Sequence, residues 1–386
     1  MKRQYIKSNI LGSYLFFYLK TGGGHLAPAK AVAEKIRSRR KSDLEILLVD
    51  GLSESNRFVK KVIEDGYKTA INKAAWTFEF LYALHKIIIV SRVTASIVSY
   101  FIRPGIEKQI LEIRPKKIVL FHFFLIKPVF DILKANNLDI PVITVVTDPF
   151  TAHPIWFLQK GQNYIVFSEL LKDWCINKGI DQDNLHVFPF VLDSKFSREI
   201  SETKKLLIRK NLGFKCVSKI ILIIGGGEGM PKGKKILKKI IARNMDAEIA
   251  IVCGKNSKLF SKATKLKDKY GISNLKVYGF IDFVHSLISI SDIVITKCGA
   301  STSMEILMMG KVPVINNYIW EQEKGNMEFV CRKNMGILEK NTSFLPDVLQ
   351  RLLTDIEYYN SLRNNIKNAS ISNGVGQVSE YILNYQ

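Results

Sequence analysis

The sequence predicts an α/β protein of two domains, each built on a parallel β-sheet. Short apolar segments alternate with helical patterns in both halves of the chain, which is typical of parallel sheets with helical crossovers. Each half opens on a glycine-rich turn directly after its first apolar segment, at residues 22–24 and 225–227. A chain of 386 residues is longer than a single hydrophobic core usually supports, which agrees with two domains.

The predicted strands form two series of five. In the first half they are expected at residues 11–19, 44–49, 117–121, 142–147 and 164–167. In the second half they are expected at residues 219–224, 248–253, 275–278, 293–296 and 312–315. Two such series, each with a glycine turn, indicate Rossmann-like domains in tandem, over residues 1–195 and 196–360. Residues 361–386 are expected to form a C-terminal helix that packs back on the first domain.

Composition excludes a disordered chain and a multi-span membrane protein, because 47% of the residues are hydrophobic and 24% are charged. The formal net charge of +22 favours an anionic partner, although a lysine-rich background accounts for part of it. The candidates are phosphorylated ligands, nucleic acid or an acidic lipid surface. No recognition motif or stacking platform for nucleic acid is present, so nucleic acid is not an expected partner.

The cysteines exclude a zinc or redox motif, because no C-x-x-C pair occurs. Their odd number argues against a disulfide framework and favours a reducing cytoplasm. They are Cys175, Cys216, Cys253, Cys298 and Cys331.

Two apolar stretches raise the question of a membrane. Residues 10–19 follow Lys2 and Arg3 like a signal peptide, but no small-residue cleavage site follows, so a buried strand is expected. Residues 87–102 are interrupted by Arg92 and are shorter than the roughly 20 residues that span a bilayer. The wider segment 74–110 mixes aromatic and aliphatic residues with cations. It is either one or two core helices or an amphipathic segment in the lipid headgroup layer.

In the first half, polar residues follow two predicted strands. His25 follows the glycine turn, and a helix is expected to begin near Pro28. The turn has neither the G-x-G-x-x-G spacing nor the lysine of a P-loop. Asp148 follows the strand 142–147, with His153 and Trp156 close behind. Asp148 either orients an imidazole or takes a proton from an acceptor hydroxyl, unless it only caps the next segment.

In the second half, the turn at residues 225–230 opens a lysine-rich helix. Its amides, the helix dipole and Lys232 or Lys234 favour a diphosphate. The lysines of 232–239 otherwise form a solvated helix face.

Residues 277–326 carry the densest set of polar residues. The amides near Ser301 face a phosphate at a helix N-terminus, and Glu305, one turn later, reaches a vicinal diol such as a ribose. Residues 317–326 combine side-chain amides and carboxylates, which suit sugar hydroxyls.

Together these residues resemble the monogalactosyl- and processive glucosyl-diacylglycerol synthases, relatives of the enzyme that adds N-acetylglucosamine to the peptidoglycan lipid carrier. The resemblance covers roughly residues 10–340. In the first half the matching residues are the glycine turn with His25, Thr147, Asp148, His153 and Trp156. In the second half they are residues 225–230, Gly279, Phe280, Thr296, Lys297, Gly299, Glu305, Tyr318, Ile319, Gln322, Glu323, Gly325 and Asn326.

The resemblance implies a GT-B fold, with two Rossmann-like domains facing each other across a cleft. It places the UDP-sugar on the second domain and the lipid acceptor on the first. By this analogy the main chain near Phe280 and Ile281 would bind the uracil base, and Glu305 would bind the ribose hydroxyls. The diphosphate would be bound near Gly226, Gly227, Gly299, Ser301 and Thr302. Hexose hydroxyls would be bound by Gln322, Glu323 and Asn326, and the acceptor by Gly24, His153 and Trp156.

The sequence departs from the family pattern at three places. Residues 299–302 read Gly-Ala-Ser-Thr where Gly-Pro-Gly-Thr is usual in the diacylglycerol enzymes. Leu26 follows His25 where a basic residue is common. Trp320 occupies a position that usually holds a small residue, so the sugar pocket is expected to differ.

The resemblance therefore predicts an inverting transferase that moves a hexose from a UDP-hexose to a lipid, diacylglycerol first, at an anionic membrane surface. His25 or Asp148 is the expected base, alone or as a pair. No metal and no cofactor is expected, and the protein is expected on the cytoplasmic face of the membrane. The alternatives are a soluble or polyprenyl-linked acceptor, and a UDP-sugar epimerase of the same fold.

Overall fold

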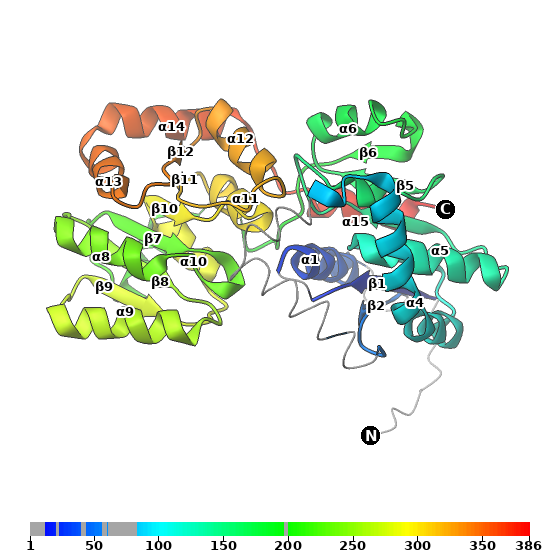
Figure 1. Cartoon of the computed structure of the whole chain (residues 1–386). Helices are drawn as coiled ribbons and strands as arrows, with labels where there is room; N and C mark the ends of the chain where they lie inside the picture. The colour runs from blue at the N-terminus through cyan, green and yellow to red at the C-terminus, as the bar shows by residue number, and fades with distance from the viewer. Residues whose placement is uncertain (1–11, 21–22, 40–43, 56–59, 61–82, 197–199) are drawn as a thin grey trace, which may run out of the picture. The chain divides into compact units, whose positions relative to one another are not determined.

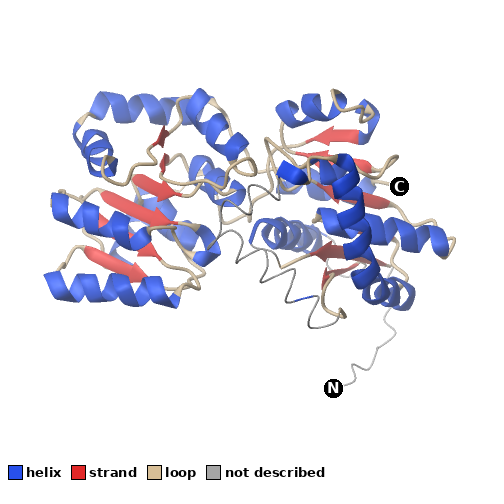
Figure 2. Cartoon of the chain, in the orientation of Figure 1, coloured by secondary structure: helices blue, strands red, loops and turns tan. Residues whose placement is uncertain are grey.

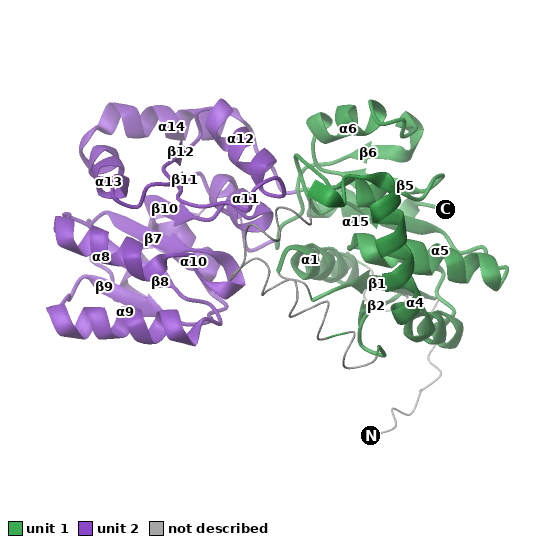
Figure 3. Cartoon of the chain, viewed as in Figure 1, with its two compact units in different colours: residues 1–193, 374–386 green, residues 194–373 purple. Residues whose placement is uncertain are grey.

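The computed structural model describes the whole chain except residues 1–11, 21–22, 40–43, 56–59, 61–82 and 197–199 (Figure 1). The chain divides into two compact units, which are described separately. Unit 1 comprises Met1–Asp193 with Gly374–Gln386, and unit 2 comprises Ser194–Asn373 (Figure 3).

Unit 1 contains a six-stranded parallel sheet of order β2-β1-β3-β4-β5-β6 (Figure 2). Its strands are β1 (Ser13–Tyr18), β2 (Glu45–Asp50), β3 (Lys117–Leu120), β4 (Val142–Val145), β5 (Asn163–Val166) and β6 (Leu185–Val187). Its helices are α1 (Gly23–Arg39), α4 (Ile88–Ile113), α5 (Ile126–Ala135), α6 (Glu169–Ile176) and α15 (Val375–Asn384). Three short 3₁₀ turns complete it, η1 (Phe123–Leu125), η2 (Pro154–Phe157) and η3 (Gln182–Asn184).

Unit 2 contains a second six-stranded parallel sheet, of order β12-β11-β10-β7-β8-β9 (Figure 2). Its strands are β7 (Ile220–Ile224), β8 (Glu248–Val252), β9 (Leu275–Tyr278), β10 (Ile293–Thr296), β11 (Val312–Ile315) and β12 (Ile337–Leu338). Its first helical elements are α7 (Glu202–Asn211), η4 (Gly226–Glu228), α8 (Gly233–Arg243) and α9 (Ser257–Tyr270). The later ones are α10 (Val284–Ile290), α11 (Ala300–Met308), α12 (Lys324–Arg332), α13 (Leu345–Thr354) and α14 (Ile356–Asn368).

All ten predicted strands are present, and most of them are buried on both faces of a helix-covered sheet. The strand β7, for example, reads Ile-Ile-Leu-Ile-Ile and is buried throughout. Such continuous apolar runs identify parallel strands well. The edge strands β6 and β12 escaped prediction because they have only 3 and 2 residues, too few for a recognisable pattern.

The domain boundaries differ from those predicted. The first boundary lies after Asp193 rather than after residue 195, and the second lies after Asn373 rather than after residue 360. Helix α14 stays with unit 2, since the Tyr359 hydroxyl donates to the Asp292 carbonyl at 3.0 Å. Only α15 joins unit 1, where Lys117 Nζ donates to the Ile382 carbonyl at 2.6 Å.

The start predicted for the first helix was wrong. Helix α1 begins at Gly23 and contains Pro28 in its interior. Proline has no N–H, so the Gly24 carbonyl lacks its donor four residues later. The glycine turn and His25 therefore belong to the first turn of a helix rather than to a loop before it.

Helix α4 covers residues 88–110 of the segment 74–110, whereas the aromatic cluster at residues 76–82 lies outside the described residues. In the first half of α4 the small residues Ser91, Ala95 and Ser99 are buried. This reverses the usual arrangement, in which large apolar side chains are buried. Large apolar side chains point outward from this half, among them Ile89, which is 71% exposed, and Tyr100, which is 77% exposed. Within the described chain, no helix combines the length and the apolar character that crossing a bilayer requires.

Candidate functional site

The strand order of unit 2 sets the position of its site. Strands β10 and β7 are neighbours, while the chain leaves β7 toward β8 and leaves β10 toward β11, in the opposite direction. Such a reversal leaves a crevice at the carboxyl ends of the two strands, where open α/β sheets bind ligands. The turns that follow β7 and β10 meet at this edge.

The turn after β7 requires glycine at several positions. A Cβ on Gly225 would lie 2.3 Å from the Gly229 carbonyl oxygen, and one on Gly254 would lie 2.3 Å from the Gly227 oxygen. Gly226 has a φ of 73°. By contrast, a Cβ on Gly227 would have no heavy atom within 4 Å, and one on Gly226 would meet only Thr302 Oγ1 at 4.0 Å. The turn is thus tightly packed around Gly225 and Gly254, and it is open on the side of Gly226 and Gly227 that faces Thr302.

The turn after β10 presents the N-terminus of α11 to the same opening. Gly299 is the N-cap residue, and no side chain caps the helix. The hydroxyl oxygens of Ser301 and Thr296 are buried and have no hydrogen-bond partner. Uncapped amides, the positive end of the helix dipole and unsatisfied hydroxyls suit an anion such as a diphosphate.

Two of the predicted sugar-binding residues hold this turn in place. Cys298 has a positive φ of 61°, and its carbonyl accepts from the buried Asn326 amide at 3.1 Å. Glu323 accepts from the Ile319 amide at 2.7 Å and lies 3.7 Å from Lys297 Nζ. Burial raises the pKa of Glu323, while Lys297 lowers it. Their direct contact with a hexose stays a prediction.

The remaining residues predicted to bind the donor border the same edge. Glu305 is half-buried in the second turn of α11, and Gln322 is half-buried before α12. Phe280, after β9, is 68% exposed, and Lys255 Nζ lies 5.6 Å from its ring centroid. Ile281 packs partly against the core of unit 2. The proposed roles of these four in binding ribose, sugar and uracil stay predictions.

Unit 1 has an equivalent switch point at β1 and β3, since β1 lies between β2 and β3 in the sheet. His25 follows β1, His122 follows β3, and Thr147 and Asp148 follow β4. The rings of His25 and His122 lie 4.4 Å apart between centroids. The fold therefore gathers the predicted catalytic residues at one edge of the sheet.

His25 is buried and well held. Its Nδ1 lies 2.8 Å from Thr147 Oγ1, and its ring also bonds the Phe121 main chain. Burial lowers the pKa of His25 to about 4, partly offset by the bond to Phe121. The imidazole is therefore neutral at pH 7, able to accept a proton but a weak base.

Asp148 is half-buried, and the indole Nε1 of Trp156 donates to its Oδ2 at 2.9 Å. Trp156 is fully buried, so the structure gives it the task of orienting Asp148. His153 is also buried, and its Nδ1 accepts from the Ile155 amide. Acceptor contacts of Gly24, His153 and Trp156 stay predictions, although a Cβ on Gly24 would meet open space.

Sequence reasoning missed His122. It is buried, its Nδ1 accepts from the Phe124 amide at 3.2 Å, and burial together with His25 lowers its pKa well below the usual value. Its position directly after the predicted strand 117–121 was the available signal, because strands 1 and 3 of such a sheet are neighbours at the switch point.

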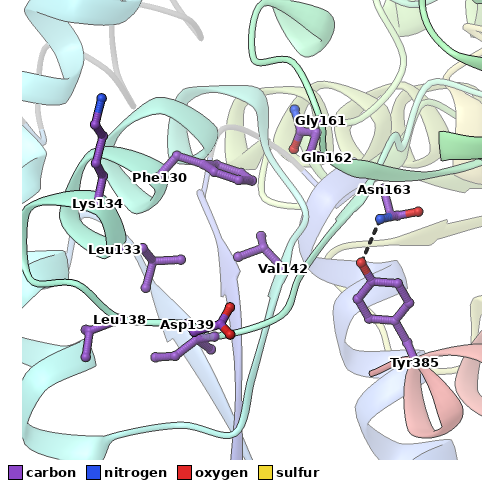
Figure 4. A pocket seen from close by; sticks show the side chains of 11 residues that line it. Phe130, Leu133, Lys134, Leu138, Asp139, Val142, Gly161, Gln162, Asn163 and Tyr385 are labelled. Carbon is purple, nitrogen blue, oxygen red and sulfur yellow. Dashed lines mark hydrogen bonds between the residues drawn. The ribbon is translucent and has the colours of Figure 1, made fainter.

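A cavity with a volume of about 310 Å³ lies elsewhere in unit 1 (Figure 4). Val142 and Asn163, the first residues of β4 and β5, line it, together with Tyr385, whose hydroxyl accepts from Asn163 at 2.6 Å. It opens at the amino ends of the strands, away from His25 and Asp148. Among the described residues, no three His, Cys, Asp or Glu side chains are grouped to hold a metal ion.

Two family models match the chain, one in each unit. Residues 25–191 match the monogalactosyldiacylglycerol (MGDG) synthase family, and residues 220–378 match the glycosyltransferase family 28 C-terminal domain. Together they confirm the resemblance seen in the sequence.

Curated relatives extend the match over most of the chain. Monogalactosyldiacylglycerol synthase 2 of Arabidopsis thaliana is 28% identical over 83% of this chain and 69% of its own length. The processive diacylglycerol beta-glucosyltransferase of Bacillus pumilus is 24% identical over 94% of this chain and 92% of its own. The chain spans 62% of the probable monogalactosyldiacylglycerol synthase of Nicotiana tabacum.

Solved structures confirm the predicted fold of two parallel α/β domains. The UDP-GlcNAc 2-epimerase of Neisseria meningitidis superposes with a TM-score of 0.60 at 13% identity, covering 96% of this chain and 98% of its own. MurG of Acinetobacter baumannii superposes with a TM-score of 0.58 at 14% identity, covering 96% and 99%. At such identities the likeness concerns the fold alone.

Proposed function

The chain belongs to the family of the monogalactosyldiacylglycerol synthases and the glycosyltransferases of family 28, and from this premise we propose that it transfers a hexose from a UDP-sugar to a lipid. Diacylglycerol is the expected acceptor, because the relatives that cover most of the chain are named for it. The matching relatives include one named as processive and several named as monogalactosyl synthases, so both modes fit the proposal.

The open turn at the switch point of unit 2 is the observation that carries the donor half of this proposal. Gly226 and Gly227 leave space on one side, and the uncapped N-terminus of α11 brings amides and the unpartnered Ser301 hydroxyl to it. Such a site suits a diphosphate without any lysine in direct contact. Glu305 lies on the same helix, within reach of a ribose attached to that diphosphate.

The reaction proposed is an inverting displacement at the anomeric carbon. The acceptor oxygen forms a bond to that carbon, the bond to the diphosphate breaks, and the hydroxyl proton passes to a base of unit 1. Asp148 suits the base better than His25, because its carboxylate is half-buried and oriented by Trp156, whereas the His25 imidazole is buried and weakly basic. UDP leaves with its charge met by the α11 amides and dipole.

We propose that neither a metal nor a cofactor takes part, since the amides and dipole of α11 meet the charge on the diphosphate. Purified protein treated with excess EDTA should therefore keep its full rate of hexosyl transfer. The rate is measured as UDP release, with and without added Mg²⁺ or Mn²⁺. Loss of turnover with EDTA and its return with a divalent ion would contradict the metal-free mechanism.

The lipid acceptor requires contact with a membrane, and α4 supplies a suitable surface. Ile89, Val93 and Ile97 follow one another at four-residue spacing and are all exposed. Arg92 is exposed beside them, where it can meet lipid phosphates. We therefore propose peripheral attachment through α4, at the cytoplasmic face of an anionic membrane.

Replacing Ile89, Val93 and Ile97 by serine together should weaken binding to lipid vesicles by about 100-fold, because each side chain loses its apolar insertion. The fold should be unaffected, since all three side chains are exposed. The matched control replaces three exposed apolar residues of unit 2, Leu206, Leu207 and Ile356. Sedimentation with vesicles measures both, and equal binding of the two variants would exclude α4 as the membrane surface.

One experiment tests the function itself. Pure protein is incubated with a panel of UDP-hexoses and a total lipid extract, and the products are identified by mass spectrometry. A new hexosyl-diacylglycerol supports the proposal. A glycosylated polyprenyl or soluble product, or interconverted UDP-sugars without any acceptor product, would replace it by one of the alternatives.

A further inference from the structure

The positive charge of unit 2 is concentrated on two adjacent helices. Helix α8 carries Lys234, Lys235, Lys238, Lys239 and Arg243, and it has no acidic residue. Helix α9 carries Lys258, Lys262, Lys265, Lys267 and Lys269, with Asp268 as its single acid. The two helices pack beside each other (Figure 1). We call the exposed surface of these two helices the α8–α9 face.

Most cations of the α8–α9 face have no carboxylate partner among the described residues. Of its ten cations, Arg243 alone forms an ion pair with a described residue, Asp347, at 3.2 Å. In two other helices of unit 2 a lysine does pair within the helix, Lys205 with Glu202 and Lys324 with Glu328. Most of the positive charge on the α8–α9 face is therefore not compensated by neighbouring carboxylates.

The spacing of these lysines is unfavourable for the isolated helices. Lys258, Lys262, Lys265 and Lys269 form one continuous stripe along α9 at intervals of four, three and four residues. Lys234 and Lys238 repeat the four-residue interval on α8. Like charges at this spacing repel each other, and an anionic surface laid against the face would turn that repulsion into attraction.

The chemistry of the face favours a lipid surface over nucleic acid. Nine of its ten cations are lysines, which act as hydrated point charges on flexible stems, whereas nucleic-acid recognition relies heavily on the planar, bidentate guanidinium of arginine. Tyr270, at the end of α9, is 56% exposed with Lys269 Nζ 5.3 Å from its ring centroid. An aromatic ring beside a lysine stem suits the boundary between headgroups and acyl chains.

We propose that the α8–α9 face is a second membrane-contact surface, which binds the anionic headgroups of a lipid bilayer independently of α4. This inference rests on the proposed function in one respect, because a lipid acceptor makes a bilayer the expected anionic partner. The apolar stripe of α4 and the cationic α8–α9 face then contribute by different forces, insertion for the first and electrostatic attraction for the second.

The test replaces Lys238, Lys239, Lys262 and Lys265 by glutamine in the full chain, leaving the lysines nearest the glycine turn untouched. The matched control replaces Lys204, Lys210, Lys333 and Lys367, four exposed lysines of unit 2 outside the face, so that both variants have the same net charge. Binding is measured by sedimentation with vesicles of phosphatidylcholine containing 30 mol% phosphatidylglycerol, and with pure phosphatidylcholine.

The face variant should bind the anionic vesicles at least about tenfold more weakly than the control variant, since each cation near an anionic surface contributes about fivefold, or about 1 kcal/mol. Its binding should also depend less on salt, and the two variants should bind neutral vesicles equally. Equal binding of both variants to the anionic vesicles would overturn the proposal. So would a face variant that keeps vesicle binding but loses binding to an oligonucleotide.

A parallel assay separates this inference from the proposed function. Hexosyl transfer to diacylglycerol in neutral detergent micelles should be the same for the face variant and the unaltered chain. The unaltered chain could transfer no hexose while the face variant still binds vesicles more weakly. That result would contradict the proposed function and would still support the α8–α9 face as a membrane-contact surface.

Discussion

Replacing Gly227 by valine should abolish UDP binding, with a loss of affinity of at least about 100-fold, or about 2.7 kcal/mol. The new side chain enters the open side of the turn after β7, where the diphosphate is expected to lie. The fold should tolerate the change, because a Cβ on Gly227 meets no heavy atom within 4 Å and its φ is not positive. Calorimetric titration with UDP measures the affinity, and thermal unfolding measures the fold.

The matched control for this change is valine at Gly24, which lies in the first turn of α1, after the first strand of unit 1. Its Cβ also meets nothing within 4 Å. This variant should bind UDP normally and lose transfer, since Gly24 borders the proposed acceptor side. If the Gly227 variant folds and binds UDP as tightly as the unaltered chain, the diphosphate does not bind at this turn.

Replacing Asp148 by asparagine should lower kcat by about 10²- to 10⁴-fold while leaving UDP affinity unchanged, as expected for loss of a general base. Asparagine keeps an oxygen that accepts from the Trp156 indole, so the local structure should persist. Changes in kcat are read from UDP release at saturating donor and acceptor, and UDP affinity from titration.

Replacing His25 by alanine separates the two candidate bases. If His25 only supports the Thr147–Asp148 turn through its bond to Thr147 Oγ1, the loss in kcat should be smaller than for Asp148. An equal loss in both variants would indicate that the two residues act as a pair. Near-native turnover in both would place the base elsewhere in unit 1, with His122 the nearest candidate.

Much of the fold was predictable because it depends on local pattern. The strands of both sheets are apolar runs such as the fully buried β7 and β10, and glycine turns follow the first strand of each half. The start of α1 was not predictable in this way. Proline favours the first helical turn, and only the packed structure shows that α1 accommodates Pro28 within it.

The residues of the candidate site could be proposed from the sequence, but the contacts that each of them forms could not. The family resemblance placed Glu323, Asn326 and Trp156 at the site, and in the structure each of them forms a hydrogen bond that holds another group. Glu323 binds the Ile319 amide, Asn326 binds the Cys298 carbonyl and Trp156 binds Asp148. Such contacts join residues up to 28 positions apart, which no local pattern records.

The position of the second unit boundary depends on such contacts as well. Helices α14 and α15 look equally amphipathic along the sequence, and their partners decide where each belongs. Tyr359 of α14 bonds Asp292 in unit 2, whereas the end of α15 is held by Lys117 of β3 in unit 1. Burial of that lysine lowers its pKa to about 8.

A crystal structure of the chain with UDP bound tests the donor site most directly. The diphosphate oxygens should lie within hydrogen-bond distance of the Gly227 amide and of the amides at Ser301 and Thr302, with the Glu305 carboxylate on the ribose hydroxyls. A nucleotide bound at any other edge of unit 2, or a ribose turned away from Glu305, would contradict it.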